Sequence, residues 1–130
     1  MLDSNVLVSA LLGHGGPRRL LLYLLREHVI VSSVQMLAEL EDVLQREKFQ
    51  LTDDQIADYM SLIISGSTVL DVADYPKVIK ADPDDDVVLA SALEGEANYL
   101  VTGDKHLLLL RAYRKTKILT VKQMLALIKN

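Results

Sequence analysis

The stretch DPDDDVVLASALEGEANYLVTGDKHLL, residues 82–108, decides the fold. Its apolar middle predicts a helix over residues 87–97, a short buried strand follows over residues 99–102, and a second helix is predicted over residues 105–114. A helix, a strand and a helix in this order are typical of an α/β fold with a parallel sheet.

The rest of the chain shows the same alternation of short apolar strands with longer segments of helical period. A Ser32-x-x-Gln35 pattern predicts a capping box at the start of one helix, and we expect Thr52 to cap the next. The polar residues 73–85 form the longest predicted loop. We therefore expect a central, mostly parallel sheet flanked by helices, an α/β/α sandwich. The remaining predicted strands cover residues 1–3, 29–31, 68–72 and 118–121, and the remaining predicted helices cover residues 6–12, 17–26, 33–47, 53–64 and the end of the chain.

Composition limits the kind of protein. A chain of 130 residues, half of them hydrophobic, can close one core, so we expect a single domain over residues 1–130. No apolar run free of charge approaches the ~20 residues that span a bilayer, and we expect no membrane partner. Cysteine is absent, which excludes disulfides and thiolate metal ligands, and we expect a cytoplasmic protein.

The net charge is −4, from 18 acidic and 14 basic residues. A protein that binds nucleic acid through the phosphates alone is expected to be basic, so this balance counts against a nucleic-acid partner. The objection weakens if several carboxylates share one pocket and bind divalent cations, because the ions reverse the local sign of the charge.

Acidic side chains follow two of the predicted strands. Asp3 ends the first strand, and Asp104 lies two residues beyond the strand that ends at Thr102. The carboxyl ends of parallel strands lie at one edge of a sheet, where the functional crevice of such folds is found. Glu39, at the border of the apolar stripe of its helix, can reach the rim of the same crevice.

Asp86 is a further candidate, at the start of the apolar helix. It shares a helical face with Leu89, Ala90 and Leu93, which must turn inward, so we expect its carboxylate to point toward the edge of the sheet. Any one of these acids has a structural explanation, because Asp and Glu are common at helix starts for capping and dipole reasons. Only the convergence of several on one cleft indicates a functional site.

Four carboxylates in one cleft repel one another unless a cation lies among them. Hard oxygen ligands without histidine or cysteine favour Mg²⁺ or Mn²⁺ over zinc. Two such ions roughly 3.5–4 Å apart can activate a water and stabilise the leaving oxygen of an in-line attack on a phosphodiester. The acidic residues therefore predict metal-dependent hydrolysis of a phosphodiester bond.

Four segments resemble, in order, the motifs of PIN-domain nucleases. The opening LDSNVLVSALL is similar to the first motif, AELEDVLQREKF to the second, and residues 82–108, with their Thr-Gly-Asp signature, to the third and fourth together. The likeness extends to the VapC-like branch, whose members are toxins of toxin–antitoxin pairs. It implies a PIN-like ribonuclease that uses Mg²⁺ or Mn²⁺, cleaves RNA, forms a homodimer and pairs with an antitoxin protein that inserts into or covers the cleft. It also implies that four acids are catalytic and bind the metal: Asp3, Glu39, Asp86 and Asp104. Asn5 and Thr102 are implied to orient their neighbours.

The run of aspartates leaves the position of the third acid open. We choose Asp86 because it directly precedes the apolar helix and lies 18 positions before Asp104, the usual spacing in the family. Asp84 is the alternative and a supporting residue, whereas Asp82 and Asp85 are expected in a cap or the loop.

Two other functions fit the same pattern. A phosphoacceptor (receiver-like) signalling domain would use Asp3, Asp71 and Lys105 to hold one Mg²⁺ and a phosphate, and would make Asp71 indispensable and Glu39 idle. A catalytically inactive PIN-fold module would keep the fold and only bind a partner.

Two features receive no functional role from the sequence. His106, two residues after Asp104, could contact a substrate, but a surface histidine is the preferred interpretation. The aromatic residues are five Tyr and one Phe, and they give no evident platform for stacking bases of a single strand.

Overall fold

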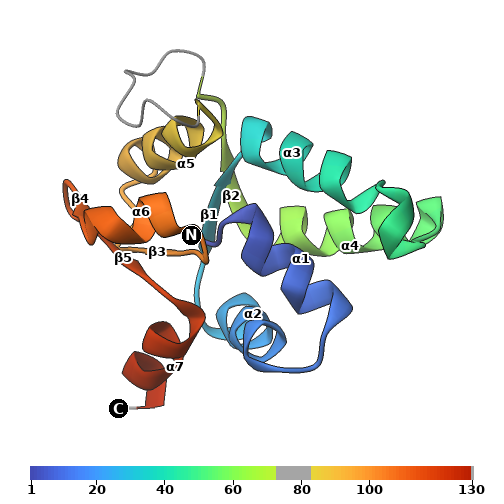
Figure 1. The fold of residues 1–130 in the computed structure, drawn as a ribbon, viewed down its shortest axis with the longest axis horizontal. Coiled ribbons are helices and arrows are strands. Elements are labelled where there is room, and N and C mark those ends of the chain that lie inside the picture. Colours follow the sequence, from blue (N-terminus) through green and yellow to red (C-terminus); the bar gives the residue numbers. More distant parts are fainter. Residues whose placement is uncertain (73–82, 130) are drawn as a thin grey trace.

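Figure 1 shows the fold in a computed structural model, which describes residues 1–72 and 83–129. The side chains of Pro83 and Asp84 are also outside the described part. Most of the loop predicted over residues 73–85 falls in the gap, whereas its last residues belong to a helix that begins at Pro83. None of the described helices combines the length and the hydrophobicity needed to cross a lipid bilayer.

Helices and strands alternate along the described chain, which confirms the predicted α/β class. The helices are α1 (Ser4–Leu12), α2 (Gly16–Glu27), α3 (Val34–Leu44), α4 (Asp53–Ser65), α5 (Pro83–Glu94), α6 (Lys105–Leu110) and α7 (Val121–Lys129), with a 3-10 turn, η1 (Glu47–Phe49). The strands are β1 (Ile30–Ser33), β2 (Ser67–Leu70), β3 (Tyr99–Val101), β4 (Ala112–Tyr113) and β5 (Thr116–Leu119).

The predicted sheet is present as two hydrogen-bonded ladders. β1 and β2 pair in parallel, with Ile30 opposite Ser67. β3 and β5 also pair in parallel, with Leu100 opposite Ile118, and β4 adds to β5 in the antiparallel sense. In Figure 1, α3 and α4 lie on one side of the ladders and α5 and α6 on the other.

The first predicted strand, residues 1–3, is reduced to a single parallel bridge between Leu2 and Val101. The Val101 N–H donates to the Met1 carbonyl at 2.9 Å, and the Asp3 N–H donates to the Val101 carbonyl at 3.0 Å. Because α1 begins at the next residue, Asp3 lies both at the end of this pairing and at the start of a helix.

Two clusters of buried apolar side chains hold these elements together. The larger cluster joins α1, α2, α3 and α4 and includes Leu40 and Ile63, both fully buried. The smaller cluster joins α5, α6, β3 and β5 and includes Leu89 and Leu100.

The start of α3 differs from the predicted capping box. Ser33, and not Ser32, is the N-cap, and its Oγ accepts a hydrogen bond from the Met36 N–H at 3.2 Å. The Gln35 side chain does not close a box on the helix, because its Nε2 donates to Asp71 Oδ1 at 2.8 Å. Ser32 and Ser33 both belong to β1, and the helix begins at Val34, directly after the strand ends.

Two other helices begin with reciprocal capping. The predicted cap Thr52 is confirmed: its Oγ1 accepts from the Gln55 N–H, and the Gln55 side chain accepts from the Thr52 N–H. Thr120 and Gln123 form the same pair of bonds at the start of α7. Each pair satisfies two backbone donors that a helix terminus leaves open.

The helix predicted over residues 105–114 is too long. α6 ends at Leu110, because Arg111 adopts a φ of 62° and its carbonyl accepts from the Ile118 N–H at 2.9 Å. The chain then turns through a hairpin between β4 and β5, with Arg114 at a φ of 55°. Glycine or asparagine normally marks such a turn, and neither is present here, so the sequence carries no signal for it.

Tyr59 joins α4 to α1. Its side chain is buried, and its hydroxyl donates to the Leu7 carbonyl at 2.6 Å. Burial raises the pKa of the Tyr59 phenol above its usual value, so the hydroxyl stays protonated and remains a donor.

We predict that Tyr59→Phe lowers the free energy of unfolding by about 1 kcal/mol, because a buried hydrogen bond is lost while the ring still packs. Urea denaturation followed by circular dichroism measures the change. Tyr23→Phe is the control, since the half-buried Tyr23 donates no hydrogen bond to the described residues, and it should leave the midpoint unchanged. Equal midpoints for Tyr59→Phe and the unaltered protein would contradict the prediction.

Candidate active site

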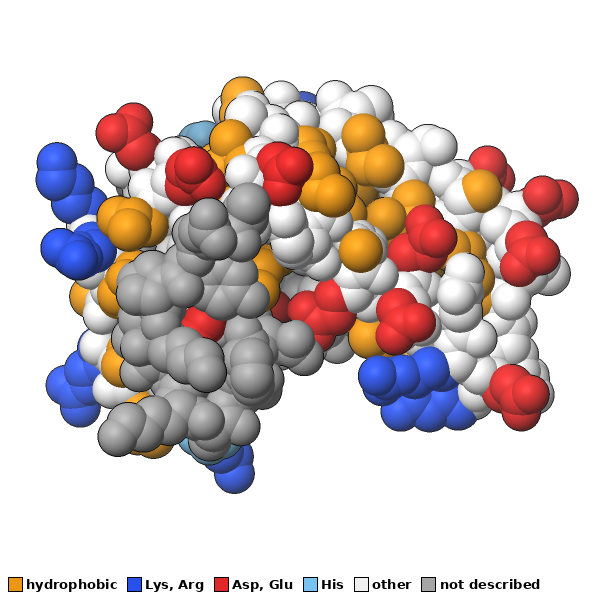
Figure 2. All heavy atoms as spheres, turned by 90° about the horizontal axis from the view of Figure 1, so that it is seen from above, with side chains coloured by type: hydrophobic (Ala, Val, Ile, Leu, Met, Phe, Trp, Pro, Cys, Tyr) orange, Lys and Arg blue, Asp and Glu red, His pale blue; other side chains and the backbone are white. Residues whose placement is uncertain are grey.

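A cavity of about 360 Å³ opens between α1, α3, η1 and the first turns of α5 and α6. Figure 2 shows acidic side chains gathered near the middle of one face of the molecule, beside a group of Lys and Arg side chains. The acidic residues that line the cavity come from four separate segments of chain: Asp3, Glu39, Asp85 and Asp104. Three of the four predicted acids are therefore brought together.

The Asp3 carboxylate is buried and held in one orientation. Its Oδ1 accepts from the Ser4 N–H at 2.8 Å, which caps α1. Its Oδ2 accepts from the Thr102 hydroxyl at 2.7 Å and from Asn5 Nδ2 at 3.3 Å. Such a network fixes the rotamer of a residue that would otherwise be free to turn.

Thr102 connects two of the acids. Besides donating to Asp3, its Oγ1 accepts from the Asp104 N–H at 3.0 Å, and its side chain is fully buried. Asn5 adds a second connection, because its Oδ1 accepts from the Gly103 N–H at 3.2 Å. Thr102 and Asn5, which the family resemblance implies orient their neighbours, thus connect the segment that carries Asp3 with the segment that carries Asp104.

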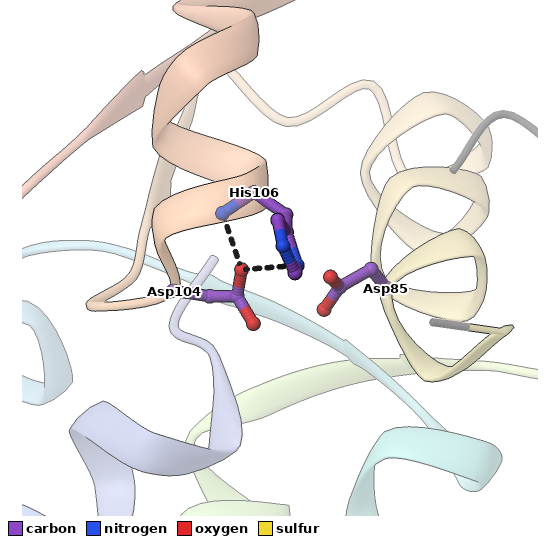
Figure 3. A group of neighbouring side chains, drawn as sticks. All are labelled: Asp85, Asp104 and His106. Atoms are coloured by element: carbon purple, nitrogen blue, oxygen red, sulfur yellow. Dashed lines mark hydrogen bonds and ion pairs between the residues drawn. The ribbon is translucent and has the colours of Figure 1, made fainter. Parts of the chain in front are cut away.

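Asp85, Asp104 and His106 form a tighter group (Figure 3). One potential ligand atom from each lies within 4.8 Å of the other two. The Asp85 carboxylate reaches from α5 toward the start of α6, where Asp104 Oδ1 accepts from the His106 N–H at 2.8 Å. The His106 ring nitrogen Nδ1 lies 3.9 Å from the same oxygen.

The remaining aspartates of residues 82–86 are placed differently. Asp86 is buried, but it does not line the cavity. Asp85, which we expected in a cap or the loop, lies in the first turn of α5 and on the cavity wall. Asp82 and the side chain of Asp84 are outside the described residues.

The rotation of α5 about its axis explains why Asp85 lines the cavity in place of Asp86. Val88 and Leu89 are buried, whereas Leu93, expected on the buried face, is 43% exposed. Residues three and four positions apart share a helical face, so the residue that shares the buried face of Val88 and Leu89 is Asp85. Asp86 and Leu89 are buried as predicted, but the exposure of Leu93 shows that the buried face is centred nearer to Asp85 than expected.

Small side chains fix this rotation. The buried Ser91 hydroxyl donates to Ser33 Oγ at 2.8 Å, which ties α5 to the end of β1. A side chain at Gly95 would collide with Val31 and Leu70, so α5 packs closely on β1 and β2 at this point. The pair Ser91 and Gly95, four residues apart, is the sequence signal that could have given the correct face.

The cavity has lining residues that sequence reasoning did not select. Ser4 is buried, and its Oγ forms no hydrogen bond with the described residues. Arg46, Lys48 and Phe49 approach from η1. The surface position preferred for His106 is confirmed, and the sequence did not indicate that this residue lies beside Asp85. No pattern in the sequence marks the η1 residues, because they reach the cavity only through the packing of α3 against α1 and α4.

The alternative site of a phosphoacceptor domain is not assembled. Asp71 is exposed, does not line the cavity with Asp3, and accepts a hydrogen bond from Gln35. Lys105 is also exposed and lines none of the cavity.

Comparison with known proteins identifies the family. The family model of the PIN domain matches residues 1–106, which include all the acidic residues of the cavity. The chain belongs to the PIN domain family. Among solved structures, this PIN domain is similar to a chain in the crystal structure of VapBC2 from Rickettsia felis bound to a DNA fragment from their promoter. The TM-score is 0.65 at 20% identity, over 92% of this chain and 96% of that chain, which is a likeness of fold. No curated protein matches the sequence.

We predict that Thr102→Val lowers the free energy of unfolding by about 2 kcal/mol, because the buried Asp3 carboxylate loses a donor and the Asp104 N–H loses an acceptor. Valine has nearly the same shape, so packing is preserved. Urea denaturation in EDTA measures the change. Thr102→Ser keeps the hydroxyl and should recover most of the stability; equal losses in both variants would show that the methyl group, and not the hydrogen bonds, matters.

Proposed function

We propose that this PIN domain is a metal-dependent endoribonuclease and the toxin component of a toxin–antitoxin pair. The observation that carries the proposal is the convergence of carboxylates from four distant segments on one cavity. Such a concentration of like charge is unfavourable unless it serves to bind cations. The motif resemblance supports RNA as the substrate, and the likeness of fold to a VapBC2 chain supports the toxin assignment.

The residues present fit a divalent cation. Asp85 and Asp104 offer carboxylate oxygens, His106 offers a ring nitrogen, and the buried Ser4 Oγ faces the same cavity with no protein partner among the described residues. The sequence argument for Mg²⁺ or Mn²⁺ assumed a site without nitrogen ligands, and His106 now offers one. The preference for these two ions therefore rests on the carboxylates alone. A cation bound here would supply Lewis acidity that polarises a phosphate and activates water.

Each residue has a proposed role that follows from its placement. Asp3, fixed by Ser4, Asn5 and Thr102, provides a preorganised carboxylate at the base of the cavity. Asp85 and Asp104 bind the cation from the two helices that face each other in Figure 3. Glu39, half-buried on α3, contributes a further carboxylate to the same space.

The wider proposals follow from the toxin assignment. The 130 residues form one domain that acts in the cytoplasm, and an antitoxin protein covers or enters the cavity. A homodimer is proposed on the basis of the family resemblance, and exposed leucines such as Leu22 and Leu109 provide apolar surface for contact between proteins.

We predict that the protein cleaves a mixed RNA pool with Mg²⁺ or Mn²⁺ and not with EDTA, and that Asp104→Asn reduces cleavage by at least about 100-fold, because a cation ligand is lost. Gel electrophoresis of labelled RNA gives the rates, and a Zn²⁺ reaction tests the choice of metal. Asp71→Asn is the matched control and should cleave at the full rate, since Asp71 lies outside the cavity. Absence of cleavage with every cation would favour an inactive binding module.

The third acid can be assigned by a paired substitution. We predict that Asp85→Asn loses cleavage and weakens Mn²⁺ binding in calorimetry, while Asp86→Asn retains both, because only Asp85 lines the cavity. Asp85→Asn should also raise the melting temperature in EDTA, since like-charge repulsion is relieved. The opposite pattern would restore Asp86 as the third acid.

A further inference from the structure

The turn η1 places the only Phe of the chain on the wall of the acidic cavity. Phe49 is half-buried and belongs to neither hydrophobic cluster. The ring therefore contributes little to the packing of the two cores, although an aromatic side chain is among the residues most strongly favoured in them. A partly exposed ring beside a functional cavity is available to contact a ligand.

A cation lies close to this ring. Lys48 Nζ is 5.0 Å from the centroid of Phe49, within the range of a cation–π contact. This contact holds the flexible Lys48 side chain at the ring and places a positive charge beside the carboxylates of the cavity.

Arg46 and Lys48 are cationic side chains without an ion-pair partner in the described part of the chain. Both side chains are exposed. Both line a cavity that otherwise contains four carboxylates, which repel a phosphate. The two cations therefore define the side from which a polyanion can approach the acids with favourable electrostatics.

An aromatic ring in a groove with cationic side chains is the combination that proteins use to hold single-stranded nucleic acid, because every base has a face that can stack and every linkage carries a phosphate. We propose that Phe49 stacks on an unpaired base next to the cleaved phosphate, while Arg46 and Lys48 contact the flanking phosphates. The proposal rests on the nuclease function above and deepens it by naming the residues that hold the base and the phosphates next to the cleaved linkage. A base within a duplex has no free face, so Phe49 can stack only on an unpaired base.

The test is binding, which does not depend on cleavage. A fluorescein-labelled, 2′-O-methyl single-stranded oligoribonucleotide of eight nucleotides is titrated with the full chain in EDTA at low salt, and anisotropy gives the affinity. Phe49→Leu keeps an apolar side chain but removes the ring face, and it should weaken binding about 10-fold. Phe49→Trp keeps a stacking face and should bind within about 2-fold of the unaltered protein.

A second cation–π pair, away from the cavity, provides the matched control. Tyr113 has Arg114 at 5.9 Å from its ring but does not line the cavity, so Tyr113→Leu should leave the affinity unchanged. A blunt RNA duplex of the same length should bind equally to the unaltered protein and to Phe49→Leu. In cleavage assays with Mn²⁺, Phe49→Leu should raise KM and leave kcat within about 2-fold.

The outcomes separate this inference from the proposed function. Equal single-strand affinity for Phe49→Leu and the unaltered protein overturns the stacking inference even if RNA is cleaved. Loss of self-association in Phe49→Leu without loss of RNA affinity also overturns it, because the ring then serves a protein interface. A 10-fold loss of affinity in a protein that cleaves no RNA supports the base site and rejects the nuclease.

Discussion

The pairing of the first residues with β3 is the contact on which the site depends. Backbone bonds from Met1 and Asp3 to Val101 place the start of the chain beside the end of a strand about 100 residues later. The same pairing puts Asp3 within reach of the Thr102 hydroxyl, and Thr102 in turn binds the Asp104 N–H. Without this parallel bridge, the two acids would belong to unrelated parts of the surface.

A second constraint is electrostatic. The carboxylates of the cavity are held by a rigid framework of helix starts and buried hydrogen bonds, so they cannot move apart to reduce their repulsion. Folding therefore maintains a local concentration of acidic side chains, whose repulsion a bound cation would reduce. Lys48 of η1 and the preceding Arg46 line the same cavity, so its local charge is mixed although the net charge of the chain is −4.

The orientation of α5 illustrates how the lining of the cavity depends on packing at a distance. The Ser91 hydroxyl donates to Ser33 Oγ at the end of β1, and a side chain at Gly95, the residue after α5, would collide with Val31 and Leu70, so the end of this helix lies close to the ladder of β1 and β2. The face that α5 turns to the cavity therefore depends on its packing and not on the aspartate run alone.

The sequence by itself determined the α/β class, most element positions and the cap at Thr52, because hydrophobic period and capping are local properties. It also determined that Asp3 and Asp104 follow strands. Tertiary structure decided what depends on contacts between distant segments. It reduced the first strand to one bridge, ended α6 at Leu110, and placed Asp85 and Phe49 on the wall of the cavity with Asp3 and Asp104. A helix leaves every face available until its neighbours are in place, and an aspartate run carries no mark of which member will turn inward.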